Sequence, residues 1–202
     1  MSNKKRLFIG VTGGIGSGKS LACEYFEKYG CKVFYADEIA KQLYHENEEL
    51  KLELVKQFGE KIIGYNGDID FNEFRQIVFK SDANQKRVNK IVHPFVIKEI
   101  LSRADKAKAK IIIKEAALMF ESGSYKYNDY NILIYSNAKI RIERVKKKRG
   151  LPAAIIKSIM KLQMPEREKK ELADFIVNNN LTKRDLEKKV RFLVEVFKMI
   201  VE

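Results

Sequence analysis

The stretch from Gly13 to Ser20 reads Gly-Gly-Ile-Gly-Ser-Gly-Lys-Ser, and its spacing is that of a phosphate-binding P-loop. Glycines let successive backbone N–H groups curl around phosphate oxygens, and a helix that follows points its partly positive N-terminus at the same anion. We expect Lys19 to reach the β and γ phosphates of a nucleoside triphosphate and Ser20 to offer its hydroxyl to Mg²⁺. The alternative is a glycine-rich turn that binds nothing, and it leaves the cluster of glycines without a reason.

The nucleotide site predicted from this loop is almost continuous in sequence. Backbone amides of Gly16, Ser17 and Gly18 would hold the phosphates together with Lys19. ATP is the expected cofactor, with Mg²⁺ bound through Ser20. The full predicted set is Gly14, Ile15, Gly16, Ser17, Gly18, Lys19, Ser20, Leu21 and Arg149.

Asp37 is the candidate catalytic base. It follows a short apolar run, residues 31–35, which reads as a second strand after the strand and helix that flank the P-loop. Ligands bind outside the carboxyl ends of such strands, and a hydroxyl that attacks a γ-phosphate needs a carboxylate to orient it and take its proton. Two other roles stay open for Asp37: the N-cap of a helix that continues from Glu38, and the positioning of Mg²⁺ through water.

A basic segment, residues 141–164, is predicted to form a mobile lid. Negative charge on a transferring phosphoryl group needs compensation, and water must be excluded while transfer takes place. Arg144 and Arg149 are the residues chosen for this role, so the predicted catalytic set is Asp37, Lys19 and Arg144. For most of the lysines and arginines in this segment, an ordinary basic helix surface is the better interpretation.

The order of elements predicts an α/β fold of the three-layer P-loop, nucleotide-kinase type. Apolar runs alternate with helical patterns, which is typical of a parallel sheet covered on both faces. The five expected strands are 7–12, 31–35, 111–113, 131–135 and 174–177. The third strand ends in Lys114-Glu115 rather than in an aspartate.

One P-loop kinase domain, residues 1–202, is expected, with its core at 1–44, 110–140 and 165–202. Between the second and third strands lies a charged stretch with helical periodicity, at about 45–109, in which His93-Pro94 is expected to interrupt a helix. This helical stretch is longer than a crossover connection between two parallel strands needs. We therefore predict a helical substrate-binding insertion that closes over a second substrate.

Composition limits the class of protein. Net charge is +13 and 33% of residues are charged, while no apolar run approaches the length of a membrane-spanning helix. Two cysteines cannot build a disulfide framework or a zinc site, which favours a reducing cytoplasm. The lysines are spread over most helical segments, so we expect phosphorylated small-molecule substrates, no nucleic acid and no membrane partner, in a monomer or weak homo-oligomer.

An ordered set of motifs resembles the dephospho-coenzyme A kinase family over nearly the whole chain. The segments that carry the resemblance are Thr12–Ser20, Tyr35–Ala40, Val92-His93-Pro94, Leu118–Glu121, Gln163 with Pro165, and Ala173-Asp174 followed by Asn178-Asn179. The resemblance implies transfer of the ATP γ-phosphate to the 3′-hydroxyl of dephospho-coenzyme A. It also implies that the helical insertion holds the acceptor and that the basic helix pair is the lid.

The chain departs from the family pattern at three places. Tyr35 stands where the family usually has an aspartate, Ala117 where it usually has a proline, and Leu21 where a second hydroxyl residue often follows Ser20. Asp37 and Ser20, which carry the predicted base and metal roles, are retained. These changes bear on loop geometry and substrate affinity more than on the type of reaction.

Two other functions stay open at this point. The first is another P-loop kinase that acts on a nucleotide or nucleoside. The second is a nucleotide-dependent switch or a nucleic-acid-binding NTPase. Against a switch, the chain has no guanine-reading Asn-Lys-x-Asp. Against a motor, no apolar strand ends in the expected aspartate.

Overall fold

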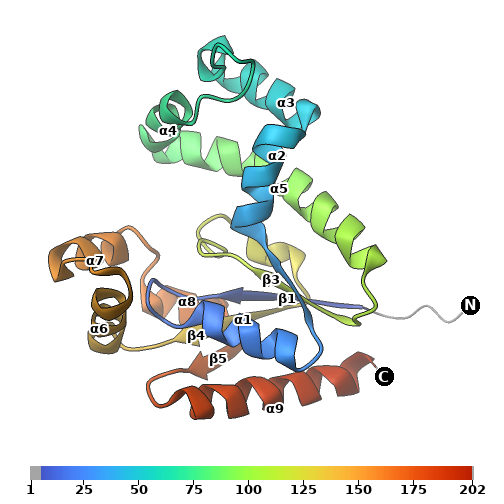
Figure 1. Ribbon diagram of the computed structural model, residues 1–202, viewed down its shortest axis with the longest axis vertical. Coiled ribbons are helices and arrows are strands. Elements are labelled where there is room, and N and C mark those ends of the chain that lie inside the picture. The colour runs from blue at the N-terminus through green and yellow to red at the C-terminus, as the bar shows by residue number, and fades with distance from the viewer. Residues whose placement is uncertain (1–5, 202) are drawn as a thin grey trace, which may run out of the picture. The chain divides into compact units, whose positions relative to one another are not determined.

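The computed structural model describes residues 6–201, apart from the side chains of Phe79 and Asp82. The chain divides into two compact units (Figure 1). The first contains Met1–Tyr35 and Ala107–Glu202 and holds the sheet, and the second is Ala36–Lys106. The second unit therefore begins with the helix that follows the second strand, before residue 45. No helix in the described part of the chain combines the length and apolar character needed to cross a membrane.

The sheet has five parallel strands in the order β2-β3-β1-β4-β5, as the predicted fold class requires. Its central strand, β1, pairs with β3 on one side and β4 on the other. The chain leaves β1 into the P-loop, so the loop emerges from the middle of the sheet at its carboxyl edge. The strands are β1 Leu7–Thr12, β2 Lys32–Tyr35, β3 Ile111–Glu115, β4 Tyr130–Tyr135 and β5 Phe175–Asn178.

Two helices, α1 (Lys19–Lys28) and α9 (Lys183–Val201), cover one face of the sheet (Figure 1). Phe26 of α1 and Phe197 of α9 are fully buried there, because apolar residues recur at helical spacing along both helices. This core contains alternate residues of every strand. The residues between them point to the opposite face of the sheet, which is also covered. The strand sequences are therefore apolar on both faces.

The opposite face is covered by the segment after β3 and by α8 (Glu166–Leu172). A β carbon added at Gly10 of β1 would lie 2.5 Å from the sulfur of Met119, so this segment packs directly on the strand. The segment contains the short helix η2, Ser124–Tyr127. Helix α8 is too short and too polar to give a clear pattern, and the sequence did not predict it. The remaining helices of this unit are α6 Ala138–Arg149, which begins three residues before the predicted lid, and α7 Ala153–Lys161, which lies within it.

The second unit is helical and packs around aromatic side chains. The Tyr44 ring contacts those of Phe71 and Phe74 edge to face, with centroids 5.7 and 5.8 Å apart, and Phe58 meets Phe74 at 5.9 Å. Its elements are α2 Ala36–Glu46, α3 Glu48–Phe58, η1 Glu60–Ile62, α4 Phe71–Phe79 and α5 Asp82–Lys106.

The predicted interruption at His93-Pro94 is wrong. Helix α5 runs unbroken from Asp82 to Lys106 with Pro94 inside it. Proline removes one backbone hydrogen bond from a helix interior. Buried side chains at four-residue spacing on both sides of it, Val88, Val92, Val96 and Ile100, hold the helix against its neighbours and outweigh that loss.

Candidate active site

The P-loop connects β1 to α1 and takes its shape from its glycines. Gly16 and Gly18 have backbone φ angles of +76° and +97°, a region that other residues rarely adopt. Neighbouring groups also approach these glycines closely. A β carbon at Gly16 would lie 2.6 Å from the backbone carbonyl oxygen of Arg141, and one at Gly18 would lie 2.2 Å from the side-chain Nδ2 of Asn179. The loop therefore needs glycine at both positions for two independent reasons.

Lys19 is the first residue of α1, and its side chain points back toward the start of the loop. Its ammonium donates a hydrogen bond to the carbonyl oxygen of Gly13 at 2.9 Å and lies 3.8 Å from Oε1 of Glu115. The Lys19 and Glu115 side chains are only 14% and 13% exposed. Glu115 ends β3, the strand beside β1. Sequence analysis placed Glu115 at the ligand edge but gave it no role, because the expected residue there was aspartate.

The other predicted residues of the loop lie beside Lys19 on α1. Ser20 is the second residue of that helix and is exposed, so its hydroxyl is accessible to a bound ion. The half-buried side chain of Leu21 packs against the core of the sheet. Ile15 and Gly16 are half-buried, and Gly14 and Ser17 are buried.

Arg144 of α6 contacts the P-loop. Its Nη2 donates to the carbonyl oxygen of Asn179 at 2.9 Å, and its Nη1 reaches the carbonyl oxygen of Ser17 at 3.5 Å. The Asn179 side chain donates to the same Ser17 oxygen at 2.8 Å. Burial lowers the pKa of the Arg144 guanidinium, which nevertheless stays charged near neutral pH. The structure thus places a positive charge beside the phosphate-binding loop, while the predicted role of Arg144 in transfer stays a prediction.

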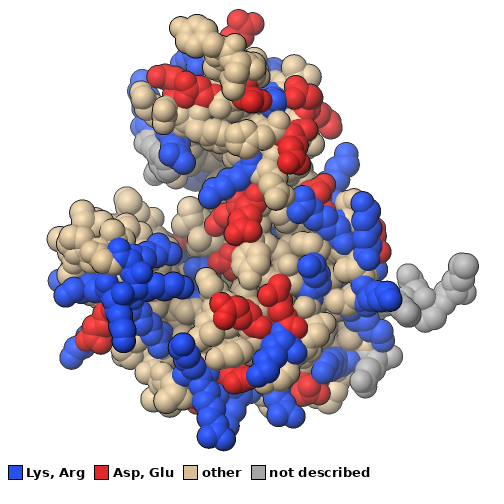
Figure 2. All heavy atoms as spheres, viewed as in Figure 1, with Lys and Arg blue, Asp and Glu red and all other residues tan. Residues whose placement is uncertain are grey.

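Arg149 lies at the other end of α6. It is the last residue of that helix and is exposed, next to Lys146, Lys147 and Lys148. Figure 2 shows lysine and arginine side chains crowded over the region of α6. Nothing in the sequence favoured Arg144 over Arg149, but in the structure Arg144 contacts the loop through Ser17, whereas Arg149 is exposed at the end of its helix. The predicted role of Arg149 in nucleotide binding stays a prediction.

Arg141, one helical turn before Arg144, is the main residue that sequence analysis did not select. Its Nε donates to the carbonyl oxygen of Ile15 at 2.8 Å, and the Ile15 N–H donates to Oε1 of Gln163 at 3.0 Å. The guanidinium also pairs with Glu166 of α8. Its place one turn from Arg144 puts both arginines on the same side of α6, which is the signal that could have identified it.

A second ion pair ties α8 to the segment that follows β3. Lys169 of α8 is fully buried, and its ammonium lies 3.0 Å from Oε1 of Glu121. The same Glu121 oxygen accepts a hydrogen bond from the Met164 N–H at 2.9 Å. The connection between α7 and α8 is therefore fixed at two points. Glu121 holds it by accepting from Met164, and Gln163, which belongs to the connection, accepts from Ile15 of the P-loop.

Asp37 belongs to the second unit. It lies in the first turn of α2, two residues after β2 ends at Tyr35, and its side chain is exposed. Because α2 begins at Ala36, Asp37 is inside the helix and is not its N-cap, so that alternative is wrong. A negative charge in the first turn of a helix is favoured by the helix dipole.

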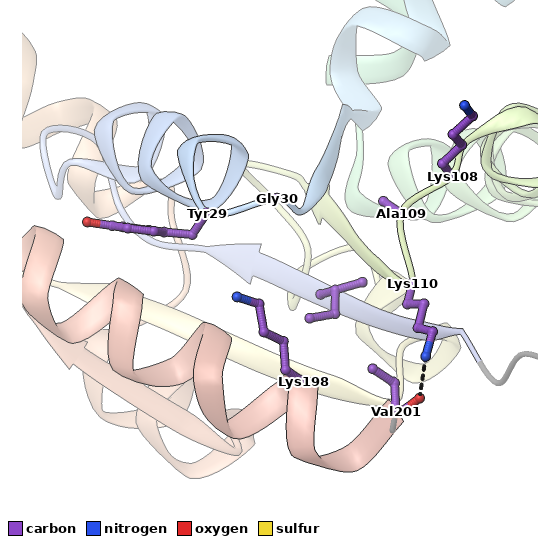
Figure 3. Close-up of a pocket in the computed structure, with 8 residues that line it drawn as sticks. Tyr29, Gly30, Lys108, Ala109, Lys110, Lys198 and Val201 are labelled. Carbon is purple, nitrogen blue, oxygen red and sulfur yellow. Dashed lines mark hydrogen bonds between the residues drawn. The ribbon is translucent and has the colours of Figure 1, made fainter.

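A pocket of about 270 Å³ lies at the other edge of the sheet, where β3 begins (Figure 3). Its lining includes Lys108, Lys110 and Lys198, together with Tyr29 and Gly30, which follow α1, and Val201, the last residue of α9. Lys110 donates to the carbonyl oxygen of Val201 at 3.2 Å, and Figure 3 shows Lys108 pointing away from the other two lysines. Helix C-termini attract cations, so the contact of Lys110 with the end of α9 is a structural one.

Comparison with known proteins gives consistent results. The sequence model of a family described as dephospho-CoA kinase matches residues 7–185. A curated dephospho-CoA kinase from Fusobacterium nucleatum is 34% identical over 189 residues, which is 94% of this chain and 97% of the relative. Among solved structures, a protein from Thermus thermophilus matches with a TM-score of 0.78 and 28% identity over 95% of this chain and 98% of that one. A dephospho-CoA kinase from Campylobacter jejuni matches with a TM-score of 0.63 and 29% identity over 96% of each chain.

Proposed function

The chain belongs to the dephospho-CoA kinase family, and from this membership we propose how its residues carry out the reaction. The enzyme is an ATP-dependent phosphotransferase. It transfers the γ-phosphate of ATP to the 3′-hydroxyl of dephospho-coenzyme A and so forms coenzyme A and ADP, the last step of coenzyme A synthesis. The observation that carries this function is the family match over residues 7–185, which includes both the P-loop and the Asp37 position.

The P-loop holds the phosphates in this proposal. Backbone N–H groups of Gly16, Ser17 and Gly18 surround them, and the ammonium of Lys19 moves from the Gly13 carbonyl to the β and γ phosphates. The clamp of Arg141 and Gln163 on Ile15 supports this role, because a loop already fixed in shape loses little entropy when it binds its ligand.

The residues present fit a Mg²⁺ ion that arrives with the nucleotide. Ser20 offers an exposed hydroxyl in the first turn of α1, and Mg²⁺ commonly uses few protein oxygens beside substrate phosphates. When bound, the ion would neutralise charge on the phosphate oxygens. Across residues 6–201 no three His, Cys, Asp or Glu side chains gather as a metal cage.

Asp37 orients the acceptor hydroxyl and takes its proton, while Arg144 stabilises negative charge on the phosphoryl group. The exposed carboxylate two residues after β2 supports the first role, and the contact of Arg144 with Ser17 supports the second. Arg149, at the end of α6, would contact the nucleotide when the lid closes. The helical insertion would hold the rest of the acceptor.

We expect the enzyme to work in a reducing cytoplasm as a monomer or weak homo-oligomer, without nucleic-acid or membrane partners. Cys23 and Cys31 support the reducing compartment, because both are free thiols buried in the core. Burial raises the pKa of the Cys31 thiol to about 12, so it stays protonated and unreactive.

The decisive experiment is a substrate panel. ADP release from MgATP would be measured with dephospho-coenzyme A and, in parallel, with AMP, CMP, dTMP, adenosine and RNA. We expect ADP only with dephospho-coenzyme A, and coenzyme A formed in equal amount. Turnover with another acceptor and none with dephospho-coenzyme A would show that the family fold is present but that the assigned substrate is wrong.

A further inference from the structure

We propose that the buried ion pair of Lys169 and Glu121 positions the P-loop for nucleotide binding. The inference rests on the proposed binding of ATP and gives a role to two charged residues that the mechanism does not use. Three observations carry it: the complete burial of Lys169, the second contact made by the Glu121 oxygen that faces it, and the link from that contact to Ile15 of the P-loop.

The Lys169 side chain is completely buried, with an exposed fraction of 0%, although it carries a charge. Its ammonium lies 3.0 Å from Oε1 of Glu121, which is 19% exposed. Within residues 6–201 this ammonium makes no hydrogen bond of good geometry, and the buried Oε2 of Glu121 has no hydrogen-bond partner. A buried ion pair with unfilled hydrogen-bonding groups is costly, and apolar side chains of similar size often replace such a pair without loss of stability. Stability alone therefore does not explain why this pair is present.

The ion pair is joined to the connection between α7 and α8. The Glu121 oxygen that faces Lys169 also accepts a hydrogen bond from the Met164 N–H at 2.9 Å. Glu121 belongs to the segment after β3, which packs on the sheet through the buried side chain of Met119. The hydrogen bond therefore ties this connection to the sheet, and the charge of Lys169 holds the accepting carboxylate in place.

The residue before Met164 reaches the P-loop. The Oε1 of Gln163 accepts a hydrogen bond from the Ile15 N–H at 3.0 Å, and Ile15 directly precedes Gly16. Adjacent residues are linked by a planar peptide unit, so the bond that holds Met164 also restrains Gln163. Gln163 in turn restrains Ile15. A loop that is already held in its binding shape loses less entropy when phosphates bind, so the ion pair contributes to nucleotide affinity from outside the site.

The other interpretation is that the ion pair only stabilises α8. Two double variants separate the interpretations, because neither leaves an unpaired buried charge. Lys169→Met/Glu121→Leu, the leucine variant, removes both charges and the acceptor of the Met164 bond. Lys169→Met/Glu121→Gln, the glutamine variant, removes both charges but keeps an amide oxygen as acceptor. We expect both to fold, with urea midpoints close to that of the wild type.

The affinity for the non-hydrolysable analogue AMP-PNP distinguishes the two variants. We expect its Kd to rise by about tenfold in the leucine variant and by less in the glutamine variant. Wild-type affinity in the leucine variant, or an equal loss in both variants, would overturn the proposal. Arg167→Met breaks an exposed ion pair with Glu171 on the same helix, so it is the matched control and should leave the Kd unchanged.

A double-mutant cycle tests the path through Gln163. Gln163→Ala removes the acceptor of the Ile15 bond, so adding the leucine variant to it should weaken AMP-PNP binding no further. Additive losses would show that the ion pair does not act through Gln163 and would overturn the proposal. If the leucine variant does not fold, Glu121→Asp takes its place, since it keeps the charge but shortens the side chain. Unchanged AMP-PNP affinity in Glu121→Asp contradicts the proposal.

None of these measurements contains dephospho-coenzyme A. Failure of the substrate panel together with weakened AMP-PNP binding in the leucine variant would overturn the assigned acceptor and leave the role of the ion pair standing. Normal AMP-PNP affinity in that variant, with coenzyme A formed by the wild type, would overturn the role of the ion pair alone.

Discussion

The P-loop of the first unit and the aromatic cluster of the second unit are each held together by a different kind of contact. In the first, polar groups far apart in sequence meet at the P-loop: Arg141 reaches Ile15 across 126 positions and Asn179 reaches Ser17 across 162. In the second, aromatic rings pack edge to face around Phe74, and burial raises the pKa of the Tyr44 phenol to about 12. Hydrogen bonds fix direction as well as distance, whereas apolar packing mainly excludes water.

This difference suits different tasks. A unit that must hold charged phosphates needs donors in fixed positions, and buried polar contacts supply them. A helical unit that is proposed to accept the rest of the substrate needs a stable frame but fewer fixed dipoles. Substitutions chosen from each unit should therefore have separable effects on nucleotide binding, transfer and stability.

The largest expected effects come from Lys19→Ala in the first unit and Asp37→Asn in the second. Loss of a phosphate-binding cation should lower kcat by on the order of 10³-fold and weaken AMP-PNP binding. Loss of the proton acceptor should lower kcat by about 10²- to 10⁴-fold and leave AMP-PNP affinity unchanged. Coenzyme A formation and titration calorimetry measure the two quantities. A near-normal kcat in Asp37→Asn would remove Asp37 from the base role.

Phe74→Ala should break the packing of the second unit. Phe74 is buried and contacts Tyr44 and Phe58, so its truncation should cost about 3–5 kcal/mol of unfolding free energy. Urea unfolding measures the loss. The exposed Tyr65 of the same unit is the control, and Tyr65→Ala should change stability by less than about 0.5 kcal/mol. At temperatures where Phe74→Ala is folded, we expect it to bind AMP-PNP as tightly as the wild type does. A loss of AMP-PNP affinity together with stability would contradict the separation of nucleotide binding from the packing of the second unit.

Arg141→Ala should loosen the P-loop itself. Removing one partner of a buried ion pair is costly, but Glu166 is 30% exposed and can be rehydrated, so we expect a loss of about 2 kcal/mol. AMP-PNP affinity should fall as well, because Ile15 loses its clamp. Arg149→Ala is the matched control on the same helix and should leave stability nearly unchanged. Arg141→Lys keeps the charge but not the forked geometry, so failure of lysine to restore affinity separates hydrogen bonding from charge.

The smallest effect is a pH dependence from Lys114. Burial lowers the pKa of its ammonium from 10.5 to about 8, so the folded state binds this proton less readily than the unfolded state. The resulting cost is complete below about pH 8 and disappears as the pH rises toward 10.5. Relative to Lys114→Met, the wild type should therefore gain about 2 kcal/mol of unfolding free energy between pH 7.5 and 9.5. If the unfolding free energies of the two proteins change equally with pH, the pKa of Lys114 is not lowered and the prediction is wrong.

Much of the fold followed from local patterns. The apolar run of β1, the glycines of the P-loop and the helix α1 form a continuous signal, and the lysines and arginines of α6 were predicted to lie on a basic helix. The apolar stripe of α9 likewise predicts the buried residues Leu186, Val190 and Phe197. In each case the information lies within one element, at the spacing that its own backbone imposes.

The predictions from sequence failed where contacts between residues far apart in the chain determine the structure. Pro94 reads as a helix break because the local cost of proline is visible in sequence and the packing that offsets it is not. Helix α8 carries little periodicity of its own, and the buried Lys169 is held there by Glu121, 48 positions earlier. Arg141 looked like any other arginine of a basic helix.

The amino-acid sequence was sufficient for the reaction type and for the position of the P-loop between a strand and a helix, because a P-loop is a local structure whose glycines and lysine are adjacent in the chain. Only the tertiary structure separated Arg144 from Arg149, made Arg141 a clamp, and brought Glu115 to within 3.8 Å of Lys19. The physical reason is that strand order sets which strand ends are neighbours. The sheet places β3 next to β1, and about a hundred residues of chain separate the two strands.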